Sequence, residues 1–320
     1  MQNRLILVVV SGILLWGFAG GTGLAFWIWT PETNKWVNPK YAVKETPKAQ
    51  FEYAREFYRA KEYTKAMTEF KKLINHYPRA REASEAQYYI GLSLEREGKP
   101  YEAFKAFQKV IEKYPFSDRS ADVVEKQFKI GERLLEGDQK RNKFVNAVTG
   151  GDYNIVDVFR AVIKNAPYGP YAPSAQYKIG LYLKEKQLYT EARDEFEKAV
   201  NDYPESPWAK AAQYQISLVD AERSSAAQYD QKTTQAAVEG FKEFVQTHPE
   251  AELSKQAQDH IHKLRSKEAE NKFLVAHFYE KQKNYKAAQI YYTAIVDDYK
   301  DTIWATKALE KIRELDGKIQ

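Results

Sequence analysis

The fold of this 320-residue chain is decided by one stretch, QYKIGLYLKEKQLYTEARDEFEKAVNDYP, residues 176–204. Small residues stand at Gly180 and Ala192, a ring follows at Phe196, and the stretch ends in Pro204. Small residues allow two helices to approach closely, and a large ring fills the space that remains between them. Proline ends a helix because it lacks the backbone donor and restricts the residue before it. This arrangement predicts two helices packed side by side as a hairpin.

The same pattern returns along the chain. Proline closes a helical segment at five places and lysine takes the equivalent place once: Pro78, Pro115, Pro167, Pro204, Pro249 and Lys300. The opening pentapeptide recurs as QYYIG at 87–91, QFKIG at 127–131 and QYQIS at 213–217. Two of the proline spacings are 37 residues, close to the period of about 34 residues in tetratricopeptide repeats, which share this order of small residues, ring and proline. The recurrence indicates a tetratricopeptide-type repeat protein.

A single hairpin cannot bury its own apolar faces, whereas stacked hairpins can. We therefore predict an all-α fold over residues 49–318, a right-handed superhelical solenoid of about six tetratricopeptide-type hairpins. A last helix, IWATKALEKIREL at 303–315, is expected to cap the C-terminal end. The six predicted hairpins cover residues 49–80, 81–117, 118–169, 170–206, 207–250 and 251–301.

Three segments depart from the regular spacing. GDQKRNKFVNAVTGGD at 137–152 is polar and basic and contains glycine, so we expect an exposed loop. SSAAQYDQKTT at 224–234 is expected to be a second loop or an extended helix end. No proline or glycine interrupts residues 253–281, which predicts one long helix or two helices joined by a tight bend.

The N-terminal residues have the pattern of an export segment. Arg4 is the only charge among the first 29 residues, and the apolar run from Leu5 to Phe18 has the length of a signal-peptide core. We assign residues 1–25 to a signal peptide or an uncleaved membrane anchor, and we favour cleavage. Both alternatives place the rest of the chain beyond the inner membrane, because the basic residue precedes the apolar run. The sequence contains no cysteine, so we expect the mature chain to carry no lipid.

Residues 26–48 contain three prolines and little periodicity, so we expect an arm or linker there instead of a domain. This arm carries Trp27, Trp29 and Trp36. Tryptophan prefers the membrane–water interface, so one interpretation is that the arm lies against a bilayer. The other interpretation is that the three rings pack on the first hairpin and cap its open face. The sequence leaves both open.

The composition excludes several classes of function. The net charge is +5 and charged residues make up 29%, with both signs interspersed, which gives little reason to expect the clustered basic face of a nucleic-acid-binding protein. The absence of cysteine excludes disulfides and thiol nucleophiles. His260 and His262 lie about 200° apart around a helix, so they cannot share one metal from one face. We expect a non-catalytic protein with no metal, no cofactor and no nucleic-acid partner.

An aromatic residue occupies the same place in all six predicted first helices. In tetratricopeptide folds the first helices line the concave face, and the resemblance implies that this position points into it. These residues are Phe51, Tyr88, Phe128, Tyr177, Tyr214 and Phe273. Their neighbours on the same face are Arg55, Tyr58, Leu92, Arg96, Leu181 and Lys184. We predict a peptide-binding groove whose rings hold apolar side chains and whose cations pair with a carboxylate. The alternative is that the rings only pack neighbouring helices.

Two C-terminal segments carry a resemblance to a known family: the unit from YDQ to GFKEFVQTHP at 229–249 and FLVAHFYEKQKNYKAAQIYYTAIVDDYKDT at 273–302. With the export segment and the repeats, they make residues 49–315 resemble BamD (ComL, YfiO), the family of outer-membrane protein assembly lipoproteins. The resemblance implies a scaffold subunit of the outer-membrane β-barrel assembly machinery, membrane-associated on the periplasmic side of the outer membrane. Its implied partners are the BamA-like barrel insertase at the C-terminal part, unfolded β-barrel outer-membrane proteins at the N-terminal repeats, and other lipoproteins of the complex.

Two features depart from the family pattern. Family members carry a lipidated cysteine and usually five repeats, whereas this chain has no cysteine and six predicted hairpins. No insertase-binding residue is therefore carried over. The alternative function is that of another periplasmic tetratricopeptide scaffold, such as a coordinator of cell division or cell-wall synthesis, although no heptad run precedes residue 49. The alternative location is an inner-membrane anchor facing the periplasm.

Overall fold

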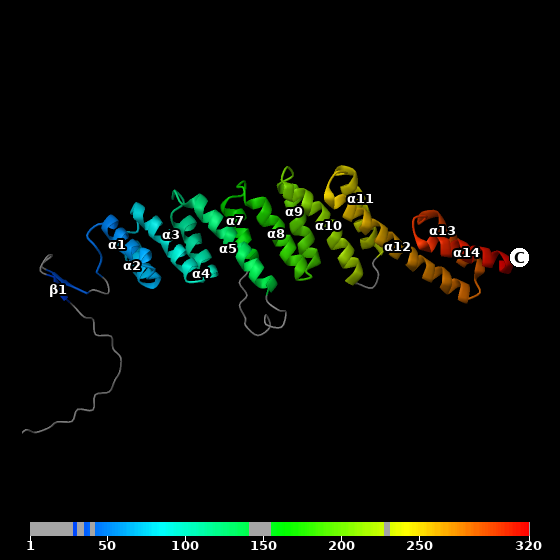
Figure 1. The fold of residues 1–320 in the computed structure, drawn as a ribbon, viewed down its shortest axis with the longest axis horizontal. Helices are drawn as coiled ribbons and strands as arrows, with labels where there is room; N and C mark the ends of the chain where they lie inside the picture. Colours follow the sequence, from blue (N-terminus) through cyan, green and yellow to red (C-terminus); the bar gives the residue numbers. More distant parts are fainter. Residues whose placement is uncertain (1–27, 31–34, 39–41, 141–154, 227–230, 320) are drawn as a thin grey trace, which may run out of the picture.

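In a computed structural model, the protein is an elongated stack of helices (Figure 1). The residues that the structure describes are 28–30, 35–38, 42–140, 155–226 and 231–319. Thirteen helices lie within them: α1 (Pro47–Arg59), α2 (Tyr63–His76), α3 (Arg81–Arg96), α4 (Pro100–Lys113), α5 (Ser120–Lys140), α7 (Ile155–Asn165), α8 (Ala172–Glu185), α9 (Tyr189–Asp202), α10 (Pro207–Ala226), α11 (Gln231–Thr247), α12 (Glu252–Lys281), α13 (Tyr285–Asp298) and α14 (Ile303–Ile319). The first twelve form six hairpins, and α14 packs on α13. The predicted tetratricopeptide solenoid with a capping helix is confirmed.

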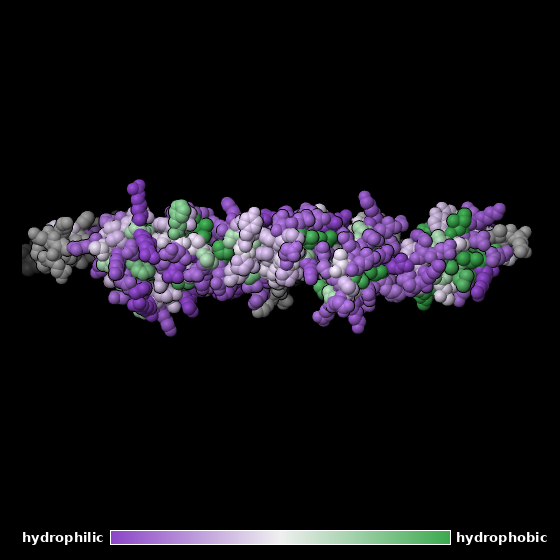
Figure 2. Space-filling view, turned by 90° about the horizontal axis from the view of Figure 1, so that it is seen from above, coloured by the Kyte–Doolittle hydropathy of each residue, from purple (hydrophilic) through white to green (hydrophobic). Residues whose placement is uncertain are grey.

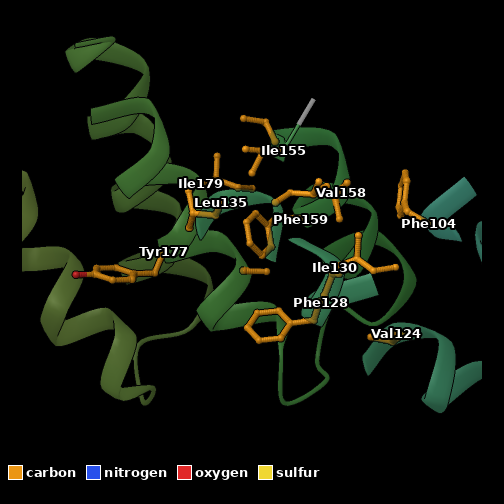
Figure 3. Close-up of a cluster of buried hydrophobic side chains, with 14 of the residues drawn as sticks. Phe104, Val124, Phe128, Ile130, Leu135, Ile155, Val158, Phe159, Tyr177 and Ile179 are labelled. Atoms are coloured by element: carbon orange, nitrogen blue, oxygen red, sulfur yellow. The ribbon is translucent and has the colours of Figure 1, made fainter. Parts of the chain in front are cut away.

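Each hairpin contains a fully buried ring on its second helix. These rings are Phe70, Phe107, Phe159, Phe196, Phe241 and Tyr292. The first helix places a small residue opposite the ring: a Cβ added at Gly180 would lie 2.6 Å from Phe196. Figure 3 shows the third hairpin, where Phe159 lies beside Phe128 and Ile130 of α5. The paired small residue and ring therefore determine how closely the two helices approach.

The turn inside four of the hairpins uses a left-handed backbone. The residues are Lys61, Gly98, Gln187 and Lys283, with φ of 61°, 74°, 61° and 60°. Glycine adopts this conformation without strain, whereas a side chain makes it costly. The third and fifth hairpins have longer connections, and residues 141–154 and 227–230 of them lie outside the described residues. Because α5 continues to Lys140, the first residues of the loop expected at 137–152 are helical instead.

The recurring proline stands second in a tight turn between hairpins. Around Pro78, the Ala80 N–H donates to the Tyr77 carbonyl at 3.1 Å. Equivalent hydrogen bonds follow α4, α7, α9, α11 and α13. Proline suits this position because its φ is already that of the turn. Lys300 takes the same position after α13, so the turn forms there without proline. These turns lie along one edge of the solenoid, the upper edge in Figure 1.

A buried glutamine joins the two helices of several hairpins. The Gln176 amide donates to the Glu195 carbonyl at 3.0 Å, and the Gln87 amide donates to the Ala106 carbonyl at 2.9 Å. Gln50 makes the same bond in the first hairpin. In each case the acceptor directly precedes the buried ring of the second helix. The pentapeptide recurs because its glutamine, its aromatic ring and its glycine all lie between the helices.

A short β-hairpin, which the sequence did not predict, precedes the solenoid. Strand β1 (Ile28–Thr30) pairs with β2 (Lys35–Val37) in antiparallel fashion, and Trp29 is opposite Trp36. The Trp36 side chain is 67% exposed. Trp36 therefore does not pack into the first hairpin, and its role at a membrane stays a prediction.

The other expectations concern helix lengths and the export segment. The predicted interval 253–281 lies in α12, a single helix of 30 residues, which confirms one of the two alternatives for it. The export segment expected at 1–25 and Trp27 lie outside the described residues. None of the helices within the described ranges is both long enough and apolar enough to span a membrane.

Candidate protein-binding surfaces

We name the six rings predicted to line a groove the aromatic ladder. Five of them lie inside the stack of helices, and Phe273 is partly buried. Five are only 5–9% exposed: Phe51, Tyr88, Phe128, Tyr177 and Tyr214. Each of the six contacts the buried ring on the second helix of its hairpin, with ring centroids 5.1–5.9 Å apart. Such contacts stabilise the fold, and the five buried rings leave a peptide little surface to bind. The rings thus lie where the alternative interpretation, packing of neighbouring helices, places them. A binding role for them stays a prediction.

Tyr88 illustrates how the ladder holds neighbouring hairpins together. Its burial and the nearby Asp122 carboxylate raise the pKa of Tyr88 to about 12. The Arg119 guanidinium lies over the ring at 5.1 Å and forms an ion pair with Glu85 at 2.9 Å. Arg119, which directly precedes α5, thus contacts both the Tyr88 ring and Glu85 of α3. This is a joint between the second and third hairpins.

Tyr58 and Arg96 do lie together, on α1 and α3. Tyr58 is half-buried, and its ring meets those of Tyr63 and Tyr89 at 5.5 and 5.1 Å. The Arg96 side chain is exposed, and its hydrogen bond with Tyr58 raises the pKa of the Arg96 guanidinium. An exposed cation next to an aromatic side chain is a suitable site for a carboxylate that follows an apolar residue.

Arg55 and Leu92 extend this cluster. Arg55 lies one helical turn before Tyr58 on α1, and Leu92 lies one helical turn before Arg96 on α3, each on the same helix face as its partner. Arg55 forms an ion pair with Glu52, and its Nε atom is buried without a hydrogen-bond partner. Leu92 is partly buried. We name Arg55, Tyr58, Leu92 and Arg96 the N-terminal cluster.

Lys184, the remaining cation of the predicted groove, lies far from this cluster along the chain. On α8 it donates to the Gln215 side-chain oxygen at 2.9 Å and forms an ion pair with Glu222 at 3.5 Å. Only 18% of its side chain is exposed. The Lys184 charge is therefore compensated by Glu222 of α10, and the contact connects the fourth and fifth hairpins.

An exposed apolar surface that the sequence analysis did not single out lies on α12 and α13. It comprises Leu274, Val275, Phe278, Ile290 and Tyr291, with exposures of 57%, 41%, 58%, 70% and 37%. We name it the C-terminal patch. Figure 2 shows hydrophobic side chains gathered toward this end of the otherwise largely hydrophilic molecule. Large exposed side chains grouped in this way mark an interaction surface in soluble proteins.

A groove of about 660 Å³ runs beside the patch, and it has a polar end. Glu268 and Lys272 line that end. Burial raises the pKa of Glu268, although Lys272 and Arg265 act against the shift. The Glu268 Oε1 atom is buried without a hydrogen-bond partner. The groove thus offers an apolar wall to a protein segment, whereas the buried Oε1 atom of Glu268 is not accessible to such a segment.

The patch was overlooked because its sequence resembles a core helix. Apolar residues in FLVAHFYE at 273–280 recur at helical spacing, and periodicity alone does not tell which of them a neighbouring hairpin covers. Phe273 and Ala276 are covered, whereas Leu274 and Phe278 are not. The available signal was Ile290, an isoleucine at a position where other second helices carry charged or polar residues.

The described residues hold no group of three or more His, Cys, Asp or Glu side chains that could bind a metal. The expectation of a protein without metal or cofactor stays a prediction. The chemistry of the described surfaces is that of protein recognition, through apolar contact, hydrogen bonds and ion pairs.

The part of the chain that carries the C-terminal patch matches a known family. The model of the family YfiO, outer membrane lipoprotein, matches residues 146–318, which is more than half of the chain. The tetratricopeptide repeat family matches residues 48–80 and 85–117, in the first two hairpins. A comparison with curated protein sequences found no match.

Similar solved structures include tetratricopeptide proteins. A repeat protein from Bacteroides fragilis is 16% identical, with 68% of this chain and 98% of that chain covered and a TM-score of 0.45. YrrB, described as having an unusual peptide-binding site, is 14% identical, with coverages of 67% and 93% and a TM-score of 0.35. MamA from Desulfovibrio magneticus is 18% identical, with coverages of 66% and 99% and a TM-score of 0.33.

Proposed function

The chain belongs to the YfiO family of outer membrane lipoproteins, and we propose that it is a non-catalytic scaffold subunit of the machinery that assembles β-barrel proteins in the outer membrane. Its place in the cell envelope follows from the family. The finer proposal is that it stands on the periplasmic side of the outer membrane. There it docks on the barrel insertase and presents unfolded barrel proteins to it.

The observation that carries the docking proposal is the C-terminal patch. It lies within the residues that the family model matches, and it exposes Leu274 and Phe278 by more than half. Burying such side chains against a partner is favourable by about 25 cal/mol for each Å² of apolar surface removed from water. The proposed occupant is a periplasmic domain of the barrel insertase.

Purification of the native complex from envelopes tests this proposal. The variant Leu274→Glu with Phe278→Glu places charges in the patch without disturbing the core, so we expect the insertase to be lost from the purified complex. Ile303→Glu is the matched control because Ile303 is 64% exposed on α14 and does not line the groove. Undiminished recovery of the insertase with the double variant would refute docking through the patch. Recovery of cell-wall enzymes alone would favour the cell-division alternative.

The second half of the proposal concerns the N-terminal cluster, which would bind the end of an unfolded barrel protein. Barrel proteins commonly end in an aromatic residue, so the aromatic ring and the C-terminal carboxylate belong to the same residue. Tyr58 would contact the ring, and Arg96 would bind the carboxylate through charge-assisted hydrogen bonds. The Arg55 side chain, 29% exposed, adds a second cation one helical turn before Tyr58.

Affinity for a synthetic peptide that ends in an aromatic residue tests the cluster. Arg96→Ala should weaken binding of the free-acid peptide about tenfold, the loss of one charge-assisted hydrogen bond. It should change binding of the same peptide with an amidated end far less. Arg59→Ala, another exposed arginine on α1, is the control. Equal losses for both peptides would show that Arg96 does not bind the carboxylate.

A further inference from the structure

A second groove lies on the first two hairpins, outside both surfaces used above. Helix α3 forms its floor, and α2 and α4 form its walls, which enclose about 490 Å³. Its apolar lining includes Met67, Ile74, Ile90 and Leu94. Helices α2 and α4 are neighbouring second helices of the solenoid (Figure 1). We name this the lysine groove, after the residues on its rims.

Four lysines line the groove. Lys105, Lys109 and Lys113 follow one another at four-residue intervals on α4, so they lie on one face of that helix. Lys71 lines the groove from α2. All four are exposed, and none forms an ion pair with any residue that the structure describes. Lys105 lies over the Tyr101 ring at 4.6 Å. Glu102 is the one acid among the lining residues.

The other hairpins provide an internal comparison, because their second helices align on the buried ring. The position of Lys105, two residues before Phe107, holds Asp157, Asp194 and Glu239 in the next three hairpins. The position of Lys113 holds Asn165, Asp202 and Thr247. Hairpins of this kind therefore fold with acids or neutral residues at these two places, and the fold does not require Lys105 or Lys113. The position of Lys109 is different, since it also holds lysine at Lys72 and Lys198.

We propose that the lysine groove binds an amphipathic helix with an acidic face, presented by a partner protein. A channel between two parallel ridges with an apolar floor receives the apolar side of a helix. The acidic residues along the edges of that helix would pair with the lysines on the rims. A bilayer is flat and would contact the rims without reaching the partly exposed Leu94 on the floor, so the shape favours a helix over a lipid surface.

Binding of a synthetic helical peptide to the full-length protein tests the proposal. The probe is about 18 residues long, enough to span α4 at about 1.5 Å per residue, with leucines on one face and glutamates on the other. We expect binding that weakens as salt is added. The control peptide carries lysine in place of each glutamate and should not bind.

Charge reversal separates the groove from other sites. The triple variant Lys105→Glu, Lys109→Glu and Lys113→Glu should lose at least about tenfold in affinity for the glutamate peptide, because three pairs become three repulsions. The same variant should gain affinity for the lysine peptide. Lys210→Glu, an exposed lysine of α10, should leave both affinities unchanged.

Several results would overturn the proposal. Absence of glutamate-peptide binding, or binding that the triple variant retains, would exclude the groove as a helix site. The last measurement uses vesicles that contain phosphatidylglycerol. If the vesicles bind the wild-type protein but not the triple variant, and the glutamate peptide binds neither protein, then the lysines bind a membrane surface and the proposal is wrong. The two grooves share no residue. If the C-terminal patch proves not to bind the insertase, the peptide test of the lysine groove therefore remains valid.

Discussion

The Gln176 side-chain amide donates a hydrogen bond to the backbone oxygen of Glu195, 3.0 Å away, between α8 and α9. Gln176 is 5% exposed, so the bond is formed out of contact with bulk water. Gln87 and Ala106 repeat the relationship in the second hairpin at 2.9 Å. The repeat is thus held by a buried polar contact as well as by the apolar pairing of glycine and ring.

Replacing Gln176 by methionine should destabilise the protein. Methionine has a similar volume but no donor, so the Glu195 carbonyl and carboxylate both lose a buried partner. We expect a loss of about 1–3 kcal/mol in the free energy of unfolding, measured by urea denaturation. Gln246→Met on α11 is the control, because Gln246 is exposed. Equal stability of the two variants would show that the buried amide contributes nothing.

Two glycine substitutions should change stability in opposite directions. A Cβ at Gly180 would lie 2.6 Å from the buried ring of Phe196, so Gly180→Ala should cost about 1–3 kcal/mol through overpacking. A Cβ at Gly137 meets no atom within 4 Å, so Gly137→Ala should gain about 0.5–1 kcal/mol by favouring the helix. Thermal melting of both variants tests the pair. A stabilised Gly180→Ala protein would contradict the close approach of α8 and α9.

The left-handed turns predict another matched pair. Gln187 has φ of 61°, and the equivalent residue of the second hairpin is Gly98 at 74°. Gln187→Gly should therefore stabilise the protein by about 0.5–1 kcal/mol, and Gly98→Gln should destabilise it by a comparable amount. The melting temperatures should move in opposite directions. Parallel shifts would mean that the two turns are not equivalent.

Glu268 should make stability depend on pH. Burial raises the pKa of its carboxyl in the folded protein. The unfolded chain therefore releases this proton at lower pH than the folded chain does, so the contribution of Glu268 to stability is lost as pH rises through the folded pKa. Glu268→Gln removes the charge, and we expect it to raise stability at neutral pH. The difference from wild type should vanish at acidic pH, where Glu268 is protonated in both states; a constant difference would contradict the buried charge.

The repeat architecture could be predicted from the sequence because its signals are local. Gly180 and Phe196 are in contact within one hairpin, and Pro204 ends it. The residues that specify a hairpin therefore all lie within one short stretch of chain. The buried role of Gln176 was present in the recurring pentapeptide but was not recognised. Glutamine is usually exposed, and only the structure shows the carbonyl that it binds.

The surfaces could not be predicted in the same way. A ring on a first helix faces either an open groove or a neighbouring helix, and the choice depends on how the hairpins pack on one another. The packing buries Tyr88 and Tyr177. It also leaves Phe278 exposed, although FLVAHFYE reads as an ordinary core helix.

The sequence by itself therefore determined the repeat, the order of the hairpins and the resemblance to the family, since these follow from residue types at fixed intervals. Only the tertiary structure decided which side chains remain exposed to a partner. Exposure is a property of the assembled stack, because each hairpin covers one face of the hairpin before it. The covered face includes Tyr177, whose burial raises the pKa of its hydroxyl, and the uncovered face includes Leu274 and Phe278.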